Sequence, residues 1–195
     1  DISEYTTGNP WSTEMKLKRL PVYKNTQSLS YDELLSTVRK TAEKSGAQIK
    51  SVTQENLPEC EWVVSENSLY AVRAETDIGL ISAFATGGVS INFSEPVAGN
   101  GTGRDAAGYF IEKYSSVIGF KNPVLCVTSD YDINGGESAE YRVYDGSGGD
   151  LKRVKSYNFG SVFFDINENG GLESIRISSV DGAKKLGDYP IISYK

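Results

Sequence analysis

Apolar residues recur at helical spacing in two parts of the chain and alternate with polar residues in most of the rest. The first helical pattern steps through every fourth position: Leu34, Val38 and Ala42. Ser30 and Glu33 stand before this run with the spacing of a capping box, and Gly46 stands where a helix C-cap is expected. The pattern predicts an amphipathic helix between Ser30 and Gly46.

A second helical pattern occupies residues 101–120, GTGRDAAGYFIEKYSSVIGF. Five apolar residues fall on one face of this predicted helix: Ala107, Phe110, Ile111, Tyr114 and Val117. Gly119 supplies a stop signal. We therefore expect a second amphipathic helix that ends at Gly119.

Period-two alternation and many β-branched or aromatic residues predict strands after each helix. The strands predicted after the first helix are residues 47–53, 61–65, 68–76, 79–86 and 88–95. Those predicted after the second helix are residues 123–130, 139–146, 154–166 and 171–179. The first 29 residues show no sustained period, and we interpret them as an extended arm with a short strand at 17–23.

The two series of elements resemble each other. At a nearly fixed offset, Tyr70 and Val72 correspond to Tyr141 and Val143. A similar offset matches three residues in each of two later strands: Val89, Ile91 and Phe93 with Val162, Phe164 and Ile166. We interpret the chain as two similar halves of about 70 residues, each a helix followed by an antiparallel meander. Chance similarity between alternating strands is the competing explanation.

This interpretation divides the chain into an N-terminal arm at 1–29, a first half at 30–98 and a second half at 99–195. Under either explanation we expect the α+β class. The helices should pack on one face of an antiparallel sheet.

Composition and charge exclude several function classes. With 38% hydrophobic and 24% charged residues, the 195-residue chain has the composition of a globular protein. A net charge of −6 argues against binding to nucleic acid or anionic lipid, because both need a basic surface. No apolar run is long enough for a membrane helix, and the chain begins at Asp1 rather than Met. We expect that a targeting segment has been removed and that any membrane contact goes through a tether outside this chain.

Cys60 and Cys126 are the two cysteines of the chain. In a secreted protein they could form one disulfide. They could also be two small apolar side chains, because sequence alone does not bring them within bonding distance. Neither is a candidate nucleophile, since the chain has no histidine to act as its base.

Two stretches, residues 129–141 and 164–174, contain the alternating Asp and Asn residues and the Gly of a calcium loop. An EF-hand loop needs a bidentate acid at its twelfth position. That position is Tyr141 in the first stretch and Arg176 in the second, so both stretches fail this requirement.

The segments on either side of these stretches alternate as strands, and Asn-Gly between two strands is a strong hairpin signal. We therefore predict hairpin turns at Asn134-Gly135 and at Asn169-Gly170. A weak calcium site at the tip of the first hairpin is the alternative. Its candidate ligands are Asp130, Asp132, Asn134 and Glu137.

The absence of histidine excludes Ser-His-Asp and Cys-His catalysis and zinc sites built from histidine. The 26 acidic residues are scattered, and no pair stands out as a general acid and base. The glycines at 99–103 precede the second helix but match neither phosphate-binding fingerprint. We predict no catalytic residue, no cofactor and no metal beyond the weak calcium alternative.

Aromatic residues offer one candidate ligand surface. Seven of them could line a groove for a sugar or a peptide: Tyr5, Trp11, Tyr23, Trp62, Tyr70, Tyr141 and Tyr144. Residues of this kind also serve as core or cross-strand pairs, which leaves both interpretations open.

Three segments resemble extracytoplasmic regions of clostridial-type Gram-positive bacteria: LKRLPVYKN, SDYDINGGESAEYRVYDGSG and KKLGDYPII. Such regions occur on lipoproteins and on membrane-bound regulators, including ones similar to beta-lactam-sensing zinc peptidases. The duplicated helix and meander is also similar in outline to PepSY-like modules and to envelope accessory proteins that restrain sensor kinases. The resemblance implies an exported, membrane-tethered module that senses or binds. No catalytic residue carries over, because the chain lacks the His-Glu-x-x-His motif of the peptidases.

Two functional hypotheses follow. The first is a non-enzymatic, extracytoplasmic sensor or protein-interaction module at the cell surface, whose partner is an envelope protein or a cell-wall component. The second is a small-ligand binding domain with a tyrosine-lined groove for a cell-wall sugar or peptide. An enzyme is the third and least supported class, given the absent histidine.

Overall fold

The computed structural model describes residues 19–25, 28–56, 70–119, 124–131, 136–142, 144–145, 152–153, 160–178 and 183–190. Its elements, in chain order, are β1 (Arg19–Asn25), α1 (Tyr31–Ser45), β2 (Ile49–Asn56), β3 (Tyr70–Thr76), β4 (Gly79–Phe84), β5 (Gly88–Val97), α2 (Gly103–Lys113), α3 (Ser115–Ile118), β6 (Val124–Tyr131), β7 (Gly136–Arg142), β8 (Tyr144–Asp145), β9 (Lys152–Arg153), β10 (Ser161–Ile166), β11 (Leu172–Ser178) and β12 (Ala183–Pro190). The α+β class expected from the sequence is confirmed.

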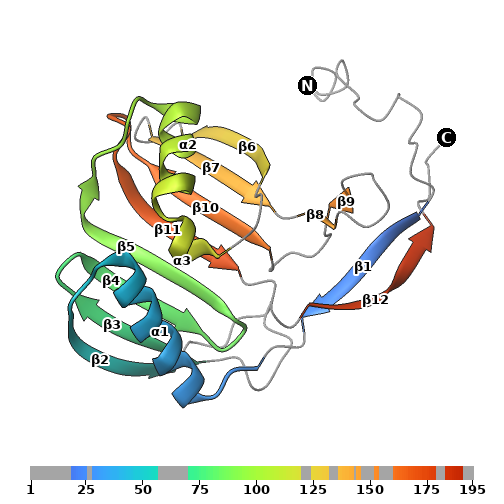
Figure 1. The fold of residues 1–195 in the computed structure, drawn as a ribbon, viewed down its shortest axis with the longest axis horizontal. Helices are drawn as coiled ribbons and strands as arrows, with labels where there is room; N and C mark the ends of the chain where they lie inside the picture. Colours follow the sequence, from blue (N-terminus) through green and yellow to red (C-terminus); the bar gives the residue numbers. More distant parts are fainter. Residues whose placement is uncertain are drawn as a thin grey trace, which may run out of the picture.

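Among the described residues, eight strands form one antiparallel sheet in the order β2-β3-β4-β5-β11-β10-β7-β6 (Figure 1). Two smaller sheets pair β1 with β12 and β8 with β9. The strand expected at 61–65 lies outside the described residues, as does Cys60. Cys126 lies on β6, so the disulfide stays a prediction.

Capping chemistry sets the limits of α1, as the sequence predicts. The carboxylate of Glu33 accepts hydrogen bonds from the backbone N–H of Ser30 at 2.8 Å and from its hydroxyl at 2.7 Å. At the other end Gly46 adopts the left-handed conformation, with φ of 72°. The apolar face predicted for this helix is buried: Leu34, Val38 and Ala42.

The second predicted helix is divided in two. α2 ends at Lys113, Tyr114 adopts a non-helical conformation, and α3 continues to Ile118 before left-handed Gly119. The apolar face is nevertheless continuous, because Phe110, Tyr114 and Ile118 are all buried at four-residue spacing. The stop at Gly119 is confirmed, whereas a single continuous helix is not.

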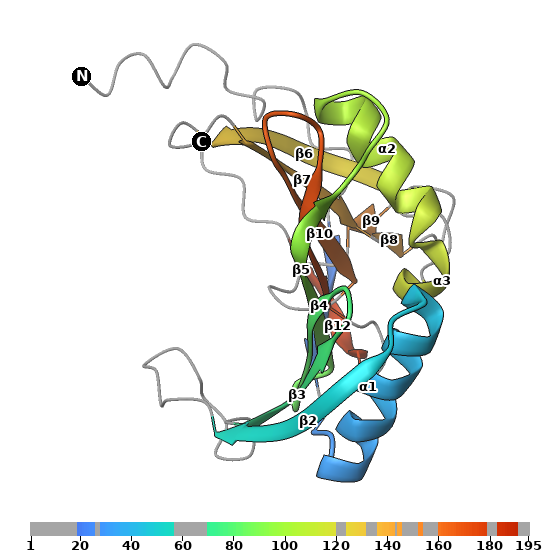
Figure 2. The same cartoon turned by 90° about the vertical axis from the view of Figure 1, so that its left-hand side faces the viewer.

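All three helices lie on one face of the eight-stranded sheet (Figure 2). α1 packs against β3 and β4, and α2 packs against β7 and β10. The short α3 contacts both α1 and α2, so the helices form one layer. This arrangement agrees with the expectation of helices on a single face.

One row of buried apolar residues crosses the helix-covered face of the sheet. Cross-strand pairing aligns its members in the order Ala74, Ile81, Ile91, Ile175, Phe164 and Ala139. These side chains are at most 1% exposed. Full burial of a large apolar side chain contributes about 1.5–3 kcal/mol, so this row is a main source of the sheet's stability.

The strand expected at 17–23 is β1, and its partner is β12. Sequence alternation gave no strand at 183–190, where Gly187 and Pro190 interrupt the pattern. β12 falls within the segment assigned to the second half, yet it pairs with the N-terminal arm and not with the eight-stranded sheet. The β1–β12 ribbon extends away from that sheet (Figure 1).

The glycine-rich loop before α2 presses against the turn between β10 and β11. A Cβ atom on Gly170 would lie 2.0 Å from the carbonyl oxygen of Gly101, and one on Gly99 would lie 2.3 Å from the carbonyl oxygen of Gly170. Gly170 also has a φ of 76°, which favours glycine. These glycines therefore permit a close approach of two backbone segments.

We expect Gly170→Ala to lower the free energy of unfolding by more than about 1 kcal/mol, because alanine meets both a strained φ and a backbone oxygen. Gly108→Ala is the matched control: Gly108 lies within α2 with nothing within 4 Å of an added Cβ. It should raise the free energy of unfolding by about 0.5–1 kcal/mol. Urea denaturation measures both, and equal effects would contradict the close approach.

The cap of α1 predicts a pH dependence. Hydrogen bonds from the Ser30 backbone N–H and then from its hydroxyl lower the pKa of Glu33 from its usual 4.5. A carboxyl with a lowered folded pKa stabilises the fold above its usual pKa, and this stabilisation is lost as pH falls through the folded pKa. Glu33→Gln should therefore melt below the parent chain at neutral pH and together with it in acid. Thermal melts across that range test this, and a gap independent of pH would refute it.

Candidate functional site

Side chains alternate between the two faces of each strand, so the register also defines the face opposite the helices, here called the open face. Val72 and Ala74 of β3 point into the helix-covered core, which places Arg73 on the open face. The register then aligns four residues across β3, β4, β5 and β11: Arg73, Ser82, Ser90 and Arg176. We call this set the donor row, because each member carries N–H or O–H groups.

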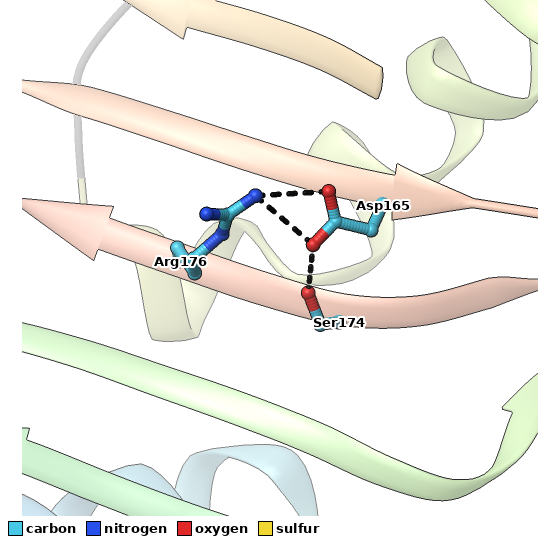
Figure 3. Close-up of polar contacts among 3 residues, drawn as sticks. All are labelled: Asp165, Ser174 and Arg176. Atoms are coloured by element: carbon cyan, nitrogen blue, oxygen red, sulfur yellow. Dashed lines mark hydrogen bonds and ion pairs between the residues drawn. The ribbon is translucent and has the colours of Figure 1, made fainter. Parts of the chain in front are cut away.

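Arg176 is held by a carboxylate on the neighbouring strand (Figure 3). Its Nη2 lies 2.9 Å and 3.1 Å from the two carboxylate oxygens of Asp165 on β10. The hydroxyl of Ser174 donates to the same carboxylate. The guanidinium carbon lies 5.5 Å from the ring centre of Phe163, within the range of a cation–π contact.

These contacts fix Arg176 from the β10 side and leave its side chain 54% exposed. A guanidinium carries five N–H donors, so Arg176 keeps donors free beyond those that face Asp165.

Arg73 is anchored from the opposite side. Its Nη1 lies 2.5 Å from Oε2 of Glu55 on β2. Its Nε is buried and is the one buried side-chain nitrogen or oxygen among the described residues that lacks a hydrogen-bond partner. A buried donor without an acceptor costs about 1–3 kcal/mol, so this guanidinium is incompletely satisfied.

Two serines lie between the arginines on the donor row. Ser82 and Ser90 pair directly across β4 and β5 and are 3% and 8% exposed. The row therefore has an arginine at each end, anchored from outside by an acid, and two buried serines between them.

A second row lies two residues further along the same strands, a distance of about 7 Å. Its members in register are Glu75, Leu80, Asn92, Ser174 and Asp165. We call it the acceptor row, because it presents carboxylate and amide oxygens. Glu75 and Asn92 are exposed. Apolar Leu80 interrupts this row, and its Ser174 hydroxyl donates to Asp165.

The structure brings together two of the four candidate calcium ligands. Asp130 and Glu137 are direct neighbours across the β6–β7 pair, whose last register pair is Tyr131 with Gly136. Asp132 and Asn134 lie outside the described residues. The antiparallel pairing of β6 with β7 agrees with the predicted hairpin, and the calcium alternative stays untested.

The second stretch, residues 164–174, forms a hairpin turn in which the Asn167 side chain hydrogen-bonds to the backbone of the turn itself. Oδ1 of Asn167 accepts hydrogen bonds from the backbone N–H of Asn169 at 3.1 Å and of Gly171 at 2.8 Å. The N–H of Gly170 donates to the carbonyl of Asn167, so the central residues of the turn are Glu168 and Asn169. The predicted turn was one residue too late, because Gly170 provides the left-handed position after the turn and not within it.

Tyrosines do not line the open face where the structure describes their side chains. Tyr141 is buried, with its ring centre 5.8 Å from that of Phe164, and burial raises its pKa. Tyr70 packs against the same core and donates its hydroxyl to the carbonyl of Leu29 at 2.5 Å. For these two residues the groove interpretation was wrong, because both sit on the helix-covered face.

For the remaining aromatic residues proposed for a groove, the structure does not describe the side chains. Tyr23 lies on β1 and Tyr144 on β8. Tyr5, Trp11 and Trp62 lie outside the described residues.

The residues that sequence reasoning missed are Arg73 and Arg176. Each stands at the polar position of an alternating strand, in VRA and IRI. This pattern signals an open polar face. It does not reveal that Ser82 and Ser90 lie between the two arginines, since that depends on the pairing of β5 with β11.

Comparison with known proteins finds no matching family model, curated protein or solved structure. No helix in the described part of the chain has the length and apolar character to cross a membrane. Within the same residues, no three potential ligands among His, Cys, Asp and Glu are grouped for a metal ion.

The hairpin interpretation predicts that calcium has no effect on stability. The melting temperature should be the same in excess calcium chloride and in excess chelator, because turn formation at 129–141 uses no ion. An upward shift of several degrees in calcium would contradict this. Loss of that shift in an Asp130→Asn variant would then assign the site to the β6–β7 hairpin.

Proposed function

We propose that this chain is a non-enzymatic, exported module that recognises a partner at the bacterial cell envelope through the open face of its sheet. The observation that carries this proposal is the polar open face itself. Its two rows of hydrogen-bonding side chains lie across neighbouring strands opposite the helix layer.

A rigid scaffold supports this role. The donor and acceptor rows stand on strands whose opposite sides are buried, so their backbone positions are fixed by the apolar core. The arginines are also anchored, by Glu55 and Asp165. Such preorganisation reduces the entropy lost when a partner binds.

The resemblance to extracytoplasmic regions supports the proposed location. It covers the segments of β1, β6–β7 and β12, which include the ribbon that joins the two ends of the described chain. A lipoprotein or membrane-bound regulator would carry such a module outside the cytoplasm. The partner is then an envelope protein or a cell-wall component.

We also propose that the module arose by duplication. The order helix, then four consecutive antiparallel neighbours, occurs twice: α1 with β2-β3-β4-β5, and α2–α3 with β6-β7-β10-β11. The two meanders meet at β5 and β11. Position in the meander makes β3 equivalent to β7, although Tyr70 opens β3 and Tyr141 lies near the end of β7.

The same topology argues against one of the sequence correspondences. Val89, Ile91 and Phe93 lie on β5, the fourth strand of its meander, whereas their offset partners lie on β10, the third. The topological counterpart of β5 is β11. The fixed offset failed here because alternating apolar residues match any strand of the same period.

A binding assay with cell envelopes tests the proposed function. The purified chain should cosediment with envelopes isolated from the organism that encodes it. Arg176→Glu should reduce the bound fraction about tenfold or more, because it places a like charge beside Asp165 and removes donors from the open face. Arg39→Glu, at an exposed position on α1, is the matched control and should bind like the parent chain.

Thermal melts would establish that both variants remain folded. Equal binding by the Arg176→Glu variant and the parent chain would contradict recognition through the open face. Failure of the parent chain to bind envelopes at all would contradict an envelope partner.

A further inference from the structure

The strand β12 has an outer edge, away from β1, on which no described strand lies. The β1–β12 ribbon extends away from the eight-stranded sheet (Figure 1). We propose that this edge pairs with the same edge of a second copy of the chain. The two copies of β12 run antiparallel about a twofold axis, which produces a four-stranded ribbon in the order β1-β12-β12-β1.

Two prolines show which backbone groups of β12 face this edge. Proline has no N–H, so it cannot complete the hydrogen-bonded type of antiparallel pair. Pro21 and Pro190 both stand in the β1–β12 ladder, and their pairs are therefore of the other type. Asp188 pairs with Pro21, and Lys185 pairs with Tyr23, two positions along β1. Because the two types alternate, the N–H and C=O groups of Asp188 and Lys185 point to the outer edge.

A β-bulge brings the side chains of Lys185 and Asp188 to the same face. The register shifts between Val22 and Tyr23, where β12 has one extra residue between Lys185 and Asp188. Residues three apart on a regular strand point to opposite faces, and the extra residue cancels this difference. The ion pair agrees with this geometry, since Nζ of Lys185 lies 3.1 Å from Oδ1 of Asp188.

These features make the outer edge of β12 complementary to itself. When the twofold axis passes between Leu186 and Gly187, Lys185 of each copy lies opposite Asp188 of the other. Each of these two pairs exchanges two backbone hydrogen bonds, because both residues point their N–H and C=O groups outward. Their side chains carry opposite charges on a shared face, so the two ion pairs within the chains join into one network of four charges.

The charges favour a second copy over an unrelated strand. Lysines on an edge strand normally oppose strand addition. A second copy provides the acid that Lys185 requires and the base that Asp188 requires, at matching positions. Both side chains are accessible, at 42% and 46% exposed.

Leu186 adds an apolar contact next to the twofold axis. Its side chain is 52% exposed, the most of any large apolar residue that the structure describes. In the dimer the two leucines lie on either side of the axis, where pairing removes part of each from water.

The opposite edge of the ribbon does not offer the same pairing. On β1 the missing N–H of Pro21 faces outward and interrupts the edge. A two-stranded ribbon is also marginally stable in water, whereas additional strands stabilise it. Pairing through β12 therefore both uses the uninterrupted edge and stabilises the ribbon.

Sedimentation equilibrium tests this inference on the parent chain, which should show a monomer–dimer equilibrium. Two short strands form an interface at the low end of the usual sizes, so we expect a dissociation constant on the order of 10–100 µM. Amide hydrogen exchange at Lys185 and Asp188 should slow as the chain is concentrated through this range, because their N–H groups become hydrogen-bonded.

Two charge variants separate pairing between chains from pairing within one chain. Lys185→Glu makes this part of the edge acidic, and Asp188→Lys makes it basic. Each variant alone should dimerise about tenfold more weakly or worse, because like charges face each other. An equimolar mixture of the two should dimerise like the parent chain, since an acidic edge then faces a basic one. The ion pair within each chain stays broken in the mixture, so a purely structural role of this pair gives no recovery.

Lys40→Glu is the matched control, because it makes the same change of charge at an exposed position on α1. It should dimerise like the parent chain. Thermal melts would verify that all three variants are folded.

A parent chain that stays monomeric at the highest concentration would overturn the inference. So would a mixture of the two charge variants that stays as monomeric as its components, or a dimer that neither variant weakens. A dimer without slower exchange at Lys185 and Asp188 would show that the copies meet at another surface. The envelope assay is independent of these results, because Arg176 lies on the open face and not on the ribbon.

Discussion

The pairing of β5 with β11 is the interaction on which the rest of the structure depends. These strands lie far apart in the sequence, and their contact joins two four-stranded meanders into one sheet. Ile91 and Ile175 face each other across this junction, both fully buried beneath the helices. Without this pair the helix-covered core would divide, and β5 and β11 would each become an exposed edge.

The same pairing creates the surface to which we assign function. Because side chains alternate along a strand, aligning Ile91 with Ile175 on one face aligns Ser90 with Arg176 on the other. A shift of one residue would exchange the two faces and bury the guanidinium in the apolar core. The apolar core and the polar recognition surface are therefore fixed by one register.

Local features of this fold could be predicted from the sequence, whereas its long-range pairings could not. The limits of α1 follow from Ser30, Glu33 and Gly46, whose capping chemistry is local. The polar character of Arg73 and Arg176 is visible in the alternation of their strands. Their relation across β4 and β5 is not, because it depends on which distant strands pair. The pairing of β1 with β12 escaped prediction for the same reason, whereas β12 itself was missed because Gly187 and Pro190 interrupt its alternation.

The central claim is that the open face is the recognition surface, and a chemical-shift map tests it most directly. The chain would be labelled with ¹⁵N and titrated with a soluble extract of the envelope of its own organism. The account predicts shifts in β3, β4, β5 and β11 and in the side-chain Nε signals of Arg73 and Arg176. Shifts confined to the outer surfaces of α1 and α2, with both arginine signals unchanged, would contradict it.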